Sequence, residues 1–286
     1  MFENRANLEQ LRFDLLKEIR QHYPEGEASS ISRLILDHCG FPLQLCLREP
    51  HQVPGPEVHL QIKEIVSEIH TGKPIQYILG FTEFFGLKIT LNESVLIPRP
   101  ETEELVYHII RSPGSPKRIM DLGTGSGCLA LALKKNDLTA RVSALDNSAA
   151  ALELARSNAR DNQLEIEFRQ TDLLAEPPPL LEQSFDLIVS NPPYVREGEK
   201  ALMEKNVLEF EPHEALFVPD EDPLIFYRAI ASFSQRNLLE GGELWVEINE
   251  ALGDKTATLF MQAGFRHLEI IKDIHHKDRF IHAGKK

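Results

Sequence analysis

Cysteine and long apolar runs are both scarce in this sequence. The three cysteines, Cys39, Cys46 and Cys128, form no CxxC pair, which favours reduced thiols over a disulfide framework or a cysteine-based zinc site. No apolar stretch approaches the length of a membrane span, and the first residues lack the basic-then-apolar layout of a signal peptide. We therefore expect a cytoplasmic protein with no membrane segment and no metal centre.

Positive charge is also scarce. The 286 residues include 31 Lys and Arg against 44 Asp and Glu, which gives a net charge of −13. Proteins that rely on phosphate contacts are more often basic, so this balance disfavours nucleic acid as a direct partner without excluding it. A composition of 42% hydrophobic and 26% charged residues is typical of a globular chain, here long enough for one large and one smaller domain.

Helical periodicity dominates the first part of the chain. Apolar residues recur at helical spacing, and Gly40 and Gly72 supply stop signals, so helices are predicted over residues 8–19, 30–39 and 56–72. Residues 1–75 are therefore expected to form a small helical domain. The alternation in "YILGFTEFFGLKITL" predicts a β-hairpin linker within residues 76–98.

Residues 99–286 alternate between short apolar strands and helices. Strands are predicted over residues 118–120, 142–145, 166–169, 185–189 and 243–248, and "FRHLEIIKD" with "DRFIHA" is expected to form a terminal antiparallel pair. Strands that alternate with helices in this way predict a mostly parallel sheet that is covered on both faces.

Polar residues and glycines follow the predicted strands. In an open parallel sheet the ligand binds beyond the carboxyl ends of the strands. Any one such residue is as well explained by a turn or a helix cap, but an ordered set at one edge favours a binding site. The set is Asp121, Gly123, Gly125, Gly127, Asp146, Asp172 and Asn191.

The spacing of the glycines separates the possible ligands. The sixth position counted from Gly123 is Cys128, so the dinucleotide pattern GxGxxG is absent, and no phosphate-binding lysine follows the loop. These features favour a nucleoside without a polyphosphate. Asp146 is placed to accept from both ribose hydroxyls, and Asp172 from an adenine amino group. S-adenosylmethionine fits this pattern.

The segment Asn191-Pro192-Pro193-Tyr194 interrupts the chain after an apolar strand. Alone it is explained by a turn, because Asn-Pro opens turns and proline ends a strand. Together with "DLGTGSG" and the acidic strand end at Asp146, it resembles the class I S-adenosylmethionine-dependent methyltransferases that act on planar nitrogen.

Three further segments narrow the resemblance. "GKPIQYILGFTEFFGL", "VLIPRPETEELV" and "EFEPHEALF" resemble the HemK/PrmC family, the glutamine N5-methyltransferases of peptide chain release factors. The resemblance implies a Rossmann-like, mostly parallel seven-stranded sheet with a terminal antiparallel hairpin, and an N-terminal helical bundle that recognises the substrate. It implies methyl transfer to the glutamine of the GGQ motif of class I release factors, with S-adenosylhomocysteine as product, by a monomer.

The resemblance also assigns site residues. The cofactor-binding set would be Asp121, Gly123, Thr124, Gly125, Ser126, Gly127, Asp146, Asp172, Leu173 and Asn191. Asn191, Pro192 and Tyr194 would be catalytic, and Pro193 would join them in binding the substrate. An amide nitrogen is a poor nucleophile and needs orientation, so the Asn191 oxygen and the Pro192 carbonyl would each accept one amide hydrogen while Tyr194 stacks on the amide.

Three questions stay open at this level. Arg99 would meet either the methionine carboxylate or a helix dipole. "WVEINE" stands where the family usually has EIG, and "DIHHKDRF" replaces a glycine-containing DxxGxxR, with His275 and His276 interpreted as an exposed turn. The alternatives to a glutamine methyltransferase are an enzyme that methylates an exocyclic amino group of a nucleic-acid base and a non-catalytic module that docks on a translation factor.

Overall fold

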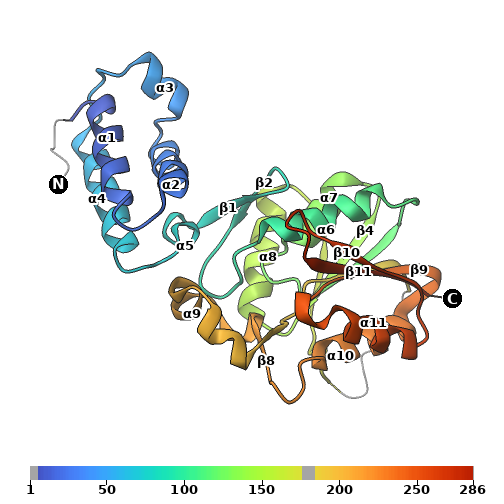
Figure 1. Ribbon diagram of the computed structural model, residues 1–286. Coiled ribbons are helices and arrows are strands. Elements are labelled where there is room, and N and C mark those ends of the chain that lie inside the picture. Colours follow the sequence, from blue (N-terminus) through green and yellow to red (C-terminus); the bar gives the residue numbers. More distant parts are fainter. Residues whose placement is uncertain (1–5, 176–183, 286) are drawn as a thin grey trace. The chain divides into compact units, whose positions relative to one another are not determined.

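The computed structural model describes residues 6–175 and 184–285 and separates into two compact units (Figure 1). The helical unit comprises Met1–Gly80 together with Lys205–Phe210. The sheet unit comprises Phe81–Glu204 and Glu211–Lys286. Within the described residues, no helix has both the length and the apolar character needed to cross a membrane.

Among its described residues, the helical unit contains six helices, which are α1 (Leu8–Ile19), α2 (Glu25–His38), α3 (Leu43–Arg48), α4 (Pro56–Ile69), α5 (Ile75–Leu79) and α9 (Lys205–Phe210). Of these, α1, α2 and α4 bury one apolar face. The apolar positions predicted on the first helix, Leu8, Leu11, Leu15 and Ile19, are all buried in its core. Asn7 caps α1 by accepting from the Gln10 amide at 2.9 Å, which satisfies one of the free amides of the first turn.

Two helical predictions need correction. The second helix begins at Glu25 rather than Ser30, because Pro24 occupies the N-cap and acidic residues follow it in the first turn. Between the second and third predicted helices, where the sequence predicted no helix, the chain forms the short helix α3, whose N-cap is Pro42. The hairpin predicted within residues 76–98 forms from β1 (Phe81–Phe84) and β2 (Leu87–Thr90), directly after Gly80, the C-cap of α5.

The sheet unit contains the predicted mostly parallel sheet. Its seven strands lie in the order β10-β11-β9-β6-β3-β4-β5. Their bounds are β3 (Arg118–Leu122), β4 (Arg141–Asp146), β5 (Glu167–Gln170), β6 (Phe185–Ser190), β9 (Leu238–Glu247), β10 (Arg266–Lys272) and β11 (Asp278–Gly284). β9, β6, β3, β4 and β5 run parallel to one another. β10 and β11 form the predicted antiparallel pair, and β11 is also antiparallel to β9. β9 begins at Leu238, five residues before the predicted start at Glu243.

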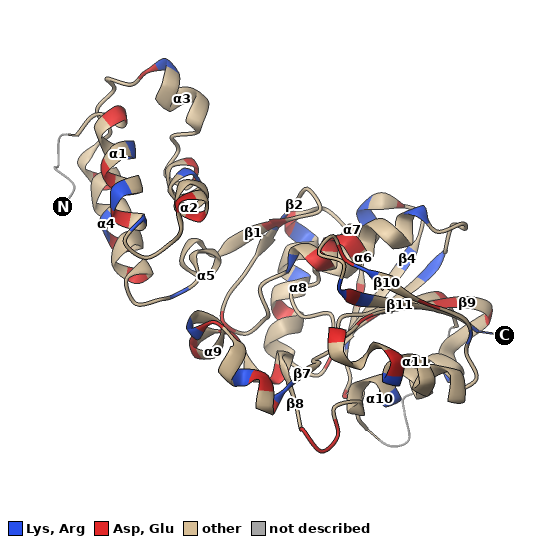
Figure 2. Ribbon diagram, viewed as in Figure 1, with Lys and Arg blue, Asp and Glu red and all other residues tan. Residues whose placement is uncertain are grey.

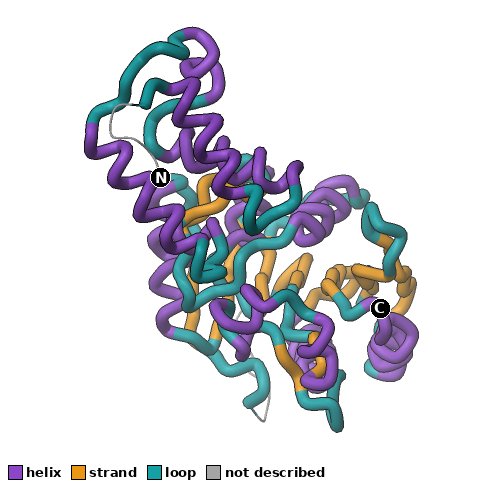
Figure 3. Tube along the Cα trace, turned by 60° about the vertical axis from the view of Figure 1, so that its left-hand side comes forward, coloured by secondary structure: helices purple, strands orange, loops and turns teal. Residues whose placement is uncertain are grey.

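Helices cover both faces of this sheet (Figures 1 and 3). α6 (Pro100–Arg111), α7 (Cys128–Asn136) and α8 (Ala149–Asp161) lie on one face, and α10 (Ile225–Asn237) and α11 (Gly253–Gln262) on the other. Ser148 caps α8 by accepting from the Ala151 amide at 3.2 Å. Short elements complete the unit: η1 (Glu197–Leu202), β7 (Val195–Arg196), η2 (His213–Ala215), β8 (Phe217–Val218) and η3 (Glu250–Leu252).

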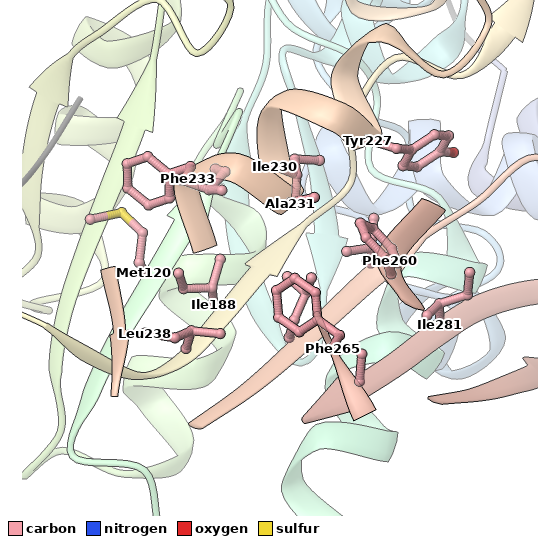
Figure 4. Packing of buried hydrophobic residues seen from close by; sticks show 14 of the residues in the cluster. Met120, Ile188, Tyr227, Ile230, Ala231, Phe233, Leu238, Phe260, Phe265 and Ile281 are labelled. Atoms are coloured by element: carbon pink, nitrogen blue, oxygen red, sulfur yellow. The ribbon is translucent and has the colours of Figure 1, made fainter. Parts of the chain in front are cut away.

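The main core lies between the sheet and the helices α10 and α11 (Figure 4). Ile188 of β6 and Met120 of β3 face Phe233 and Ile230 of α10 there, and each of these side chains is fully buried. Burying one such side chain contributes about 1.5–3 kcal/mol. This packing fixes β3 and β6 as the rigid centre from which the loops at the carboxyl edge emerge.

Candidate functional site

A cavity opens at the carboxyl edge of the sheet, within the sheet unit. The loops that follow β3, β4, β5 and β6 form its wall, together with residues 94–102 and 212–215. It brings together most of the site residues predicted from the sequence: Gly123, Thr124, Gly125, Ser126, Asp146, Asp172, Leu173, Asn191, Pro192 and Pro193. Asp121, Gly127 and Tyr194 are not among its lining residues.

The glycine loop turns sharply between β3 and α7. Gly123 and Gly125 have φ angles of +71° and +54°, a backbone region that favours glycine, and a Cβ added at either would meet no atom within 4 Å. The loop is tied to β4, because the amides of Gly123 and Thr124 both donate to the Leu145 carbonyl at 2.9 Å. The backbone is therefore open to close approach by a ligand.

Gly127 has a different role from the other loop glycines. Its φ angle is +84°, and an added Cβ would lie 3.2 Å from the Ala155 Cβ on α8. A side chain here would both strain the backbone and push α8 away. Gly127 thus lets the start of α7 pack against α8, which shapes the loop from outside the cavity.

Asp121 lies beneath the loop rather than in the cavity. Its side chain is fully buried, and its Oδ2 accepts from the Thr124 hydroxyl at 2.6 Å. Burial raises the pKa of Asp121 to about 7; the Thr124 hydrogen bond opposes this, and the nearby Asp146 charge adds to it. Asp121 therefore supports Thr124, which does line the cavity.

Asp146 ends β4 beside the glycine loop. Its Oδ2 accepts from the Gly125 amide at 2.8 Å and its Oδ1 from the Ser148 amide at 2.9 Å. A carboxylate oxygen accepts more than one hydrogen bond, so both oxygens keep capacity for ligand hydroxyls. Asp172 is exposed at the cavity wall, where its Oδ1 accepts from the Leu174 amide at 2.9 Å.

Asn191 follows β6 and belongs to a chain of hydrogen bonds that sequence reasoning missed. Its Nδ2 donates to the Thr102 hydroxyl at 3.1 Å, and that hydroxyl donates to Glu247 Oε2 at 2.8 Å. The Tyr194 hydroxyl donates to the other Glu247 oxygen at 2.9 Å. Thr102 and Glu247 are only 2% and 1% exposed, so this is a buried network against the cavity.

Burial dominates the titration of this network. It raises the pKa of Glu247, against the hydrogen bonds from Thr102 and Tyr194 and the positive charge of Arg279. Burial and the Glu247 charge together hold the pKa of Tyr194 well above its usual value. Tyr194 also packs against the main core, so its predicted stacking on a substrate amide remains a prediction.

The two segments that depart from the family pattern both reach this network. Glu247 belongs to "WVEINE", and Asn249, where the family pattern has glycine, donates to the Tyr194 carbonyl at 3.1 Å. In "DIHHKDRF", Asp273 and Arg279 keep the family spacing and pair at 3.1 Å, while His276 takes the glycine position with φ of +61°. The acidic and basic positions of both family patterns are therefore kept in this chain, and only the glycines are replaced.

Arg99 lines the cavity at the N-cap of α6 and pairs with Glu211 at 2.6 Å. The second Glu211 oxygen accepts from the Ile97 amide at 3.2 Å, and the Glu211 side chain is only 1% exposed. One carboxylate from "EFEPHEALF" therefore holds the segment "IPRP" against the cavity. A guanidinium already paired with a carboxylate offers less charge to a ligand carboxylate.

Comparison with known proteins agrees with this architecture. The family model "Methyltransferase small domain" matches residues 101–210. A methyltransferase from Pyrococcus furiosus superposes with a TM-score of 0.53 at 19% identity, over 77% of this chain and 96% of that one. A 16S rRNA N2 G1207 methyltransferase from T. thermophilus, solved with AdoMet and guanosine, gives 0.52 at 20% identity over 72% and 50%. The fold is that of a class I methyltransferase.

Sequence relatives narrow the class to one family. A protein of Flavobacterium psychrophilum named release factor glutamine methyltransferase is 48% identical over 227 residues, which covers 78% of this chain and 79% of the relative. A protein of Bacteroides thetaiotaomicron with the same name is 44% identical over 270 residues, covering 94% and 97%. The chain belongs to the release factor glutamine methyltransferase family.

Proposed function

We propose that this protein transfers a methyl group from S-adenosylmethionine to the side-chain amide nitrogen of the glutamine in the GGQ motif of class I release factors. The observation that carries the proposal is that one cavity is lined by the open glycine loop, Asp146 and Asn191-Pro192-Pro193. Membership of the family supports the activity and the substrate.

The cavity residues fit S-adenosylmethionine. Gly123 and Gly125 leave room for close approach of a ligand, and Asp146 offers two acceptor oxygens for a ribose. Exposed Asp172 and half-buried Leu173 would meet an adenine ring. When bound, the cofactor supplies a methyl group on a cationic sulfur, the charge of which suits a cavity lined by carboxylates.

The protein's own residues would then orient the substrate. The Asn191 carboxamide oxygen accepts one hydrogen of the substrate amide, and the Pro192 carbonyl accepts the other. Prolines hold that carbonyl rigidly and bring no competing donor. No strong base is required, since the nitrogen becomes acidic as it gains the methyl group, and preorganised hydrogen bonds do most of the work.

We further propose that the helical unit selects the protein substrate. Its surface carries large exposed apolar side chains, including Phe13 at 64%, Leu47 at 63% and Leu60 at 56% exposure. Such side chains can contact a folded partner. The proposed limits are residues 1–75 for this recognition domain, 76–98 for the hairpin linker and 99–286 for the catalytic domain.

The alternative substrate, a nucleic-acid base, is not favoured. Acidic residues are interspersed with basic ones throughout the ribbon in Figure 2, and the loop before α10 carries Asp220, Glu221 and Asp222. Like charge repels the phosphate backbone, which dominates nucleic-acid affinity.

Mass spectrometry of a purified release factor tests the proposal. After incubation with the protein and S-adenosylmethionine, we expect one added methyl group on the GGQ glutamine. Asn191→Ala should lower the single-turnover rate roughly a hundredfold or more, the scale seen when one transition-state hydrogen bond is removed. Asn191→Asp retains an acceptor and should keep part of the rate. Transfer to RNA or DNA but not to the release factor would reject the glutamine substrate.

A further inference from the structure

The buried hydrogen bonds that join Asn191, Thr102 and Glu247 determine which group of the Asn191 carboxamide faces Thr102. A hydroxyl has one proton, and the Thr102 proton is directed at Glu247 Oε2, 2.8 Å away. Towards Asn191, 3.1 Å away, the Thr102 oxygen can then only accept. The group that Asn191 turns to Thr102 must therefore be its NH₂.

We propose that Thr102 and Glu247 are positioning residues that hold the Asn191 carboxamide in one orientation, with its oxygen left free to accept from the substrate amide. This inference rests on the proposed function. An asparagine side chain that rotated by half a turn would present its NH₂ to the substrate amide, and two donors would then face each other. The reaction needs an acceptor at this point.

Glu247 gives the chain its direction because a carboxylate only accepts hydrogen bonds. Its two oxygens receive one donor each, from Thr102 and Tyr194. Neither bond is exposed to water, since Glu247 is 1% exposed and Thr102 is 2% exposed. Water therefore does not compete for these groups, and the orientation is maintained without a ligand.

The three residues come from different parts of the sheet unit. Thr102 lies in the first turn of α6, Asn191 follows β6, and Glu247 ends β9. Asn249, two residues after Glu247, also fixes the backbone of the Asn-Pro-Pro-Tyr segment through the Tyr194 carbonyl. The end of β9 thus supports the side chain of Asn191, and Asn249 just beyond it supports the segment that follows Asn191.

The test removes the Thr102 hydroxyl while keeping its shape. In Thr102→Val we expect the single-turnover rate at saturating cofactor to fall about tenfold or more, because a misplaced positioning group costs on that order. Calorimetric affinity for S-adenosylhomocysteine should stay within about twofold, since the carboxamide direction concerns the substrate amide. Thr102→Ser keeps the hydroxyl and should restore most of the rate that the valine variant loses.

Thr256→Val is the matched control. Thr256 of α11 is also fully buried, and its hydroxyl donates to the Leu252 carbonyl at 2.9 Å. Thr256→Val loses a buried hydroxyl, as Thr102→Val does, but Thr256 does not line the cavity. This variant should therefore keep the parental rate. A similar loss of rate in Thr256→Val, or a loss in Thr102→Val that serine does not restore, would reduce Thr102 to a structural residue and overturn the proposal.

A second readout does not depend on catalysis. The side-chain NH₂ signals of Asn191 can be assigned by NMR through their loss in Asn191→Ala. We expect slow exchange of these protons with water in the parental protein and at least tenfold faster exchange in Thr102→Val. If the parental protein does not methylate a release factor, the proposed function fails, whereas the exchange rates still decide the orientation. Equal exchange in both proteins would overturn it.

Discussion

At the scale of single residues, Asp121 is a carboxyl group without access to water. Burial raises its pKa from 3.8 to about 7, which means that the folded state holds this proton at pH values where the unfolded chain has released it. The stabilising contribution of the bound proton is complete below pH 3.8 and is lost as the pH rises through about 7.

We predict that Asp121→Asn removes this pH dependence. As the pH rises from roughly 4 to 7, the Asp121 carboxyl should lower the free energy of unfolding of the parental protein by up to about 1.4 kcal/mol for each pH unit. Urea unfolding of both proteins at pH 5, 6, 7 and 8 measures it. The difference between parent and variant should change steadily up to about pH 7 and then level off; a constant difference would show that Asp121 does not retain its proton.

At the scale of elements, the turn between β10 and β11 stores strain. The Asp273 carboxylate holds this turn by accepting from the amides of His275 and Lys277 and from Arg279 Nε. His276 occupies the left-handed position of the turn with φ of +61°, a conformation that costs a residue with a side chain about 1–2 kcal/mol.

We expect His276→Gly to stabilise the sheet unit. Glycine relieves the backbone strain but loses more entropy on folding, so the net gain in unfolding free energy should be about 0.5–1 kcal/mol. The control is His275→Gly, which lies in the same exposed turn without a positive φ and should give no gain. Thermal unfolding of the three proteins measures the effect; equal gains in both variants would rule out strain at His276.

The element pattern of this chain was largely predictable, whereas its buried polar network was not. Periodicity indicated α1, α4, the parallel strands and the antiparallel pair, because each reflects residues that are close in sequence. The short helix α3 escaped because prolines before and after it suggested a loop. Asn191 lies 89 residues and Glu247 lies 145 residues from Thr102 in the sequence. No local pattern encodes pairing over such separations.

The site residues show the same limit. The glycine loop, Asp146 and the Asn-Pro-Pro segment were recognisable because their type and their place after strands are local properties. The separate roles of individual residues could not be predicted. Asp121 supports Thr124 from beneath the glycine loop, Gly127 allows α7 and α8 to approach each other, and Arg99 pairs with Glu211. These roles depend on which elements become neighbours in the folded sheet unit.

At the scale of the whole molecule, every cavity residue belongs to the sheet unit. We predict that a chain beginning at Phe81 binds S-adenosylhomocysteine with parental affinity and methylates a short GGQ peptide. On a folded release factor its rate should fall tenfold or more, because tenfold corresponds to about 1.4 kcal/mol, on the order of the free energy of one or two apolar contacts. The full chain, assayed on the same peptide and protein, is the control. Equal rates of the two chains on the folded release factor would remove the recognition role from the helical unit.

The central place of β6 in the sheet has a consequence for folding kinetics. β6 pairs with β3 through Leu122 and Ser190, and with β9 through Ser190 and Val246, so it joins segments far apart in the chain. Closing such long loops costs chain entropy before any contact rewards it, which makes parallel pairing a slow event. The helices can form within microseconds from local contacts. During refolding, methyl-transfer activity should therefore recover later than the helical signal. The rate of that recovery would measure how fast β6 pairs with β3 and β9.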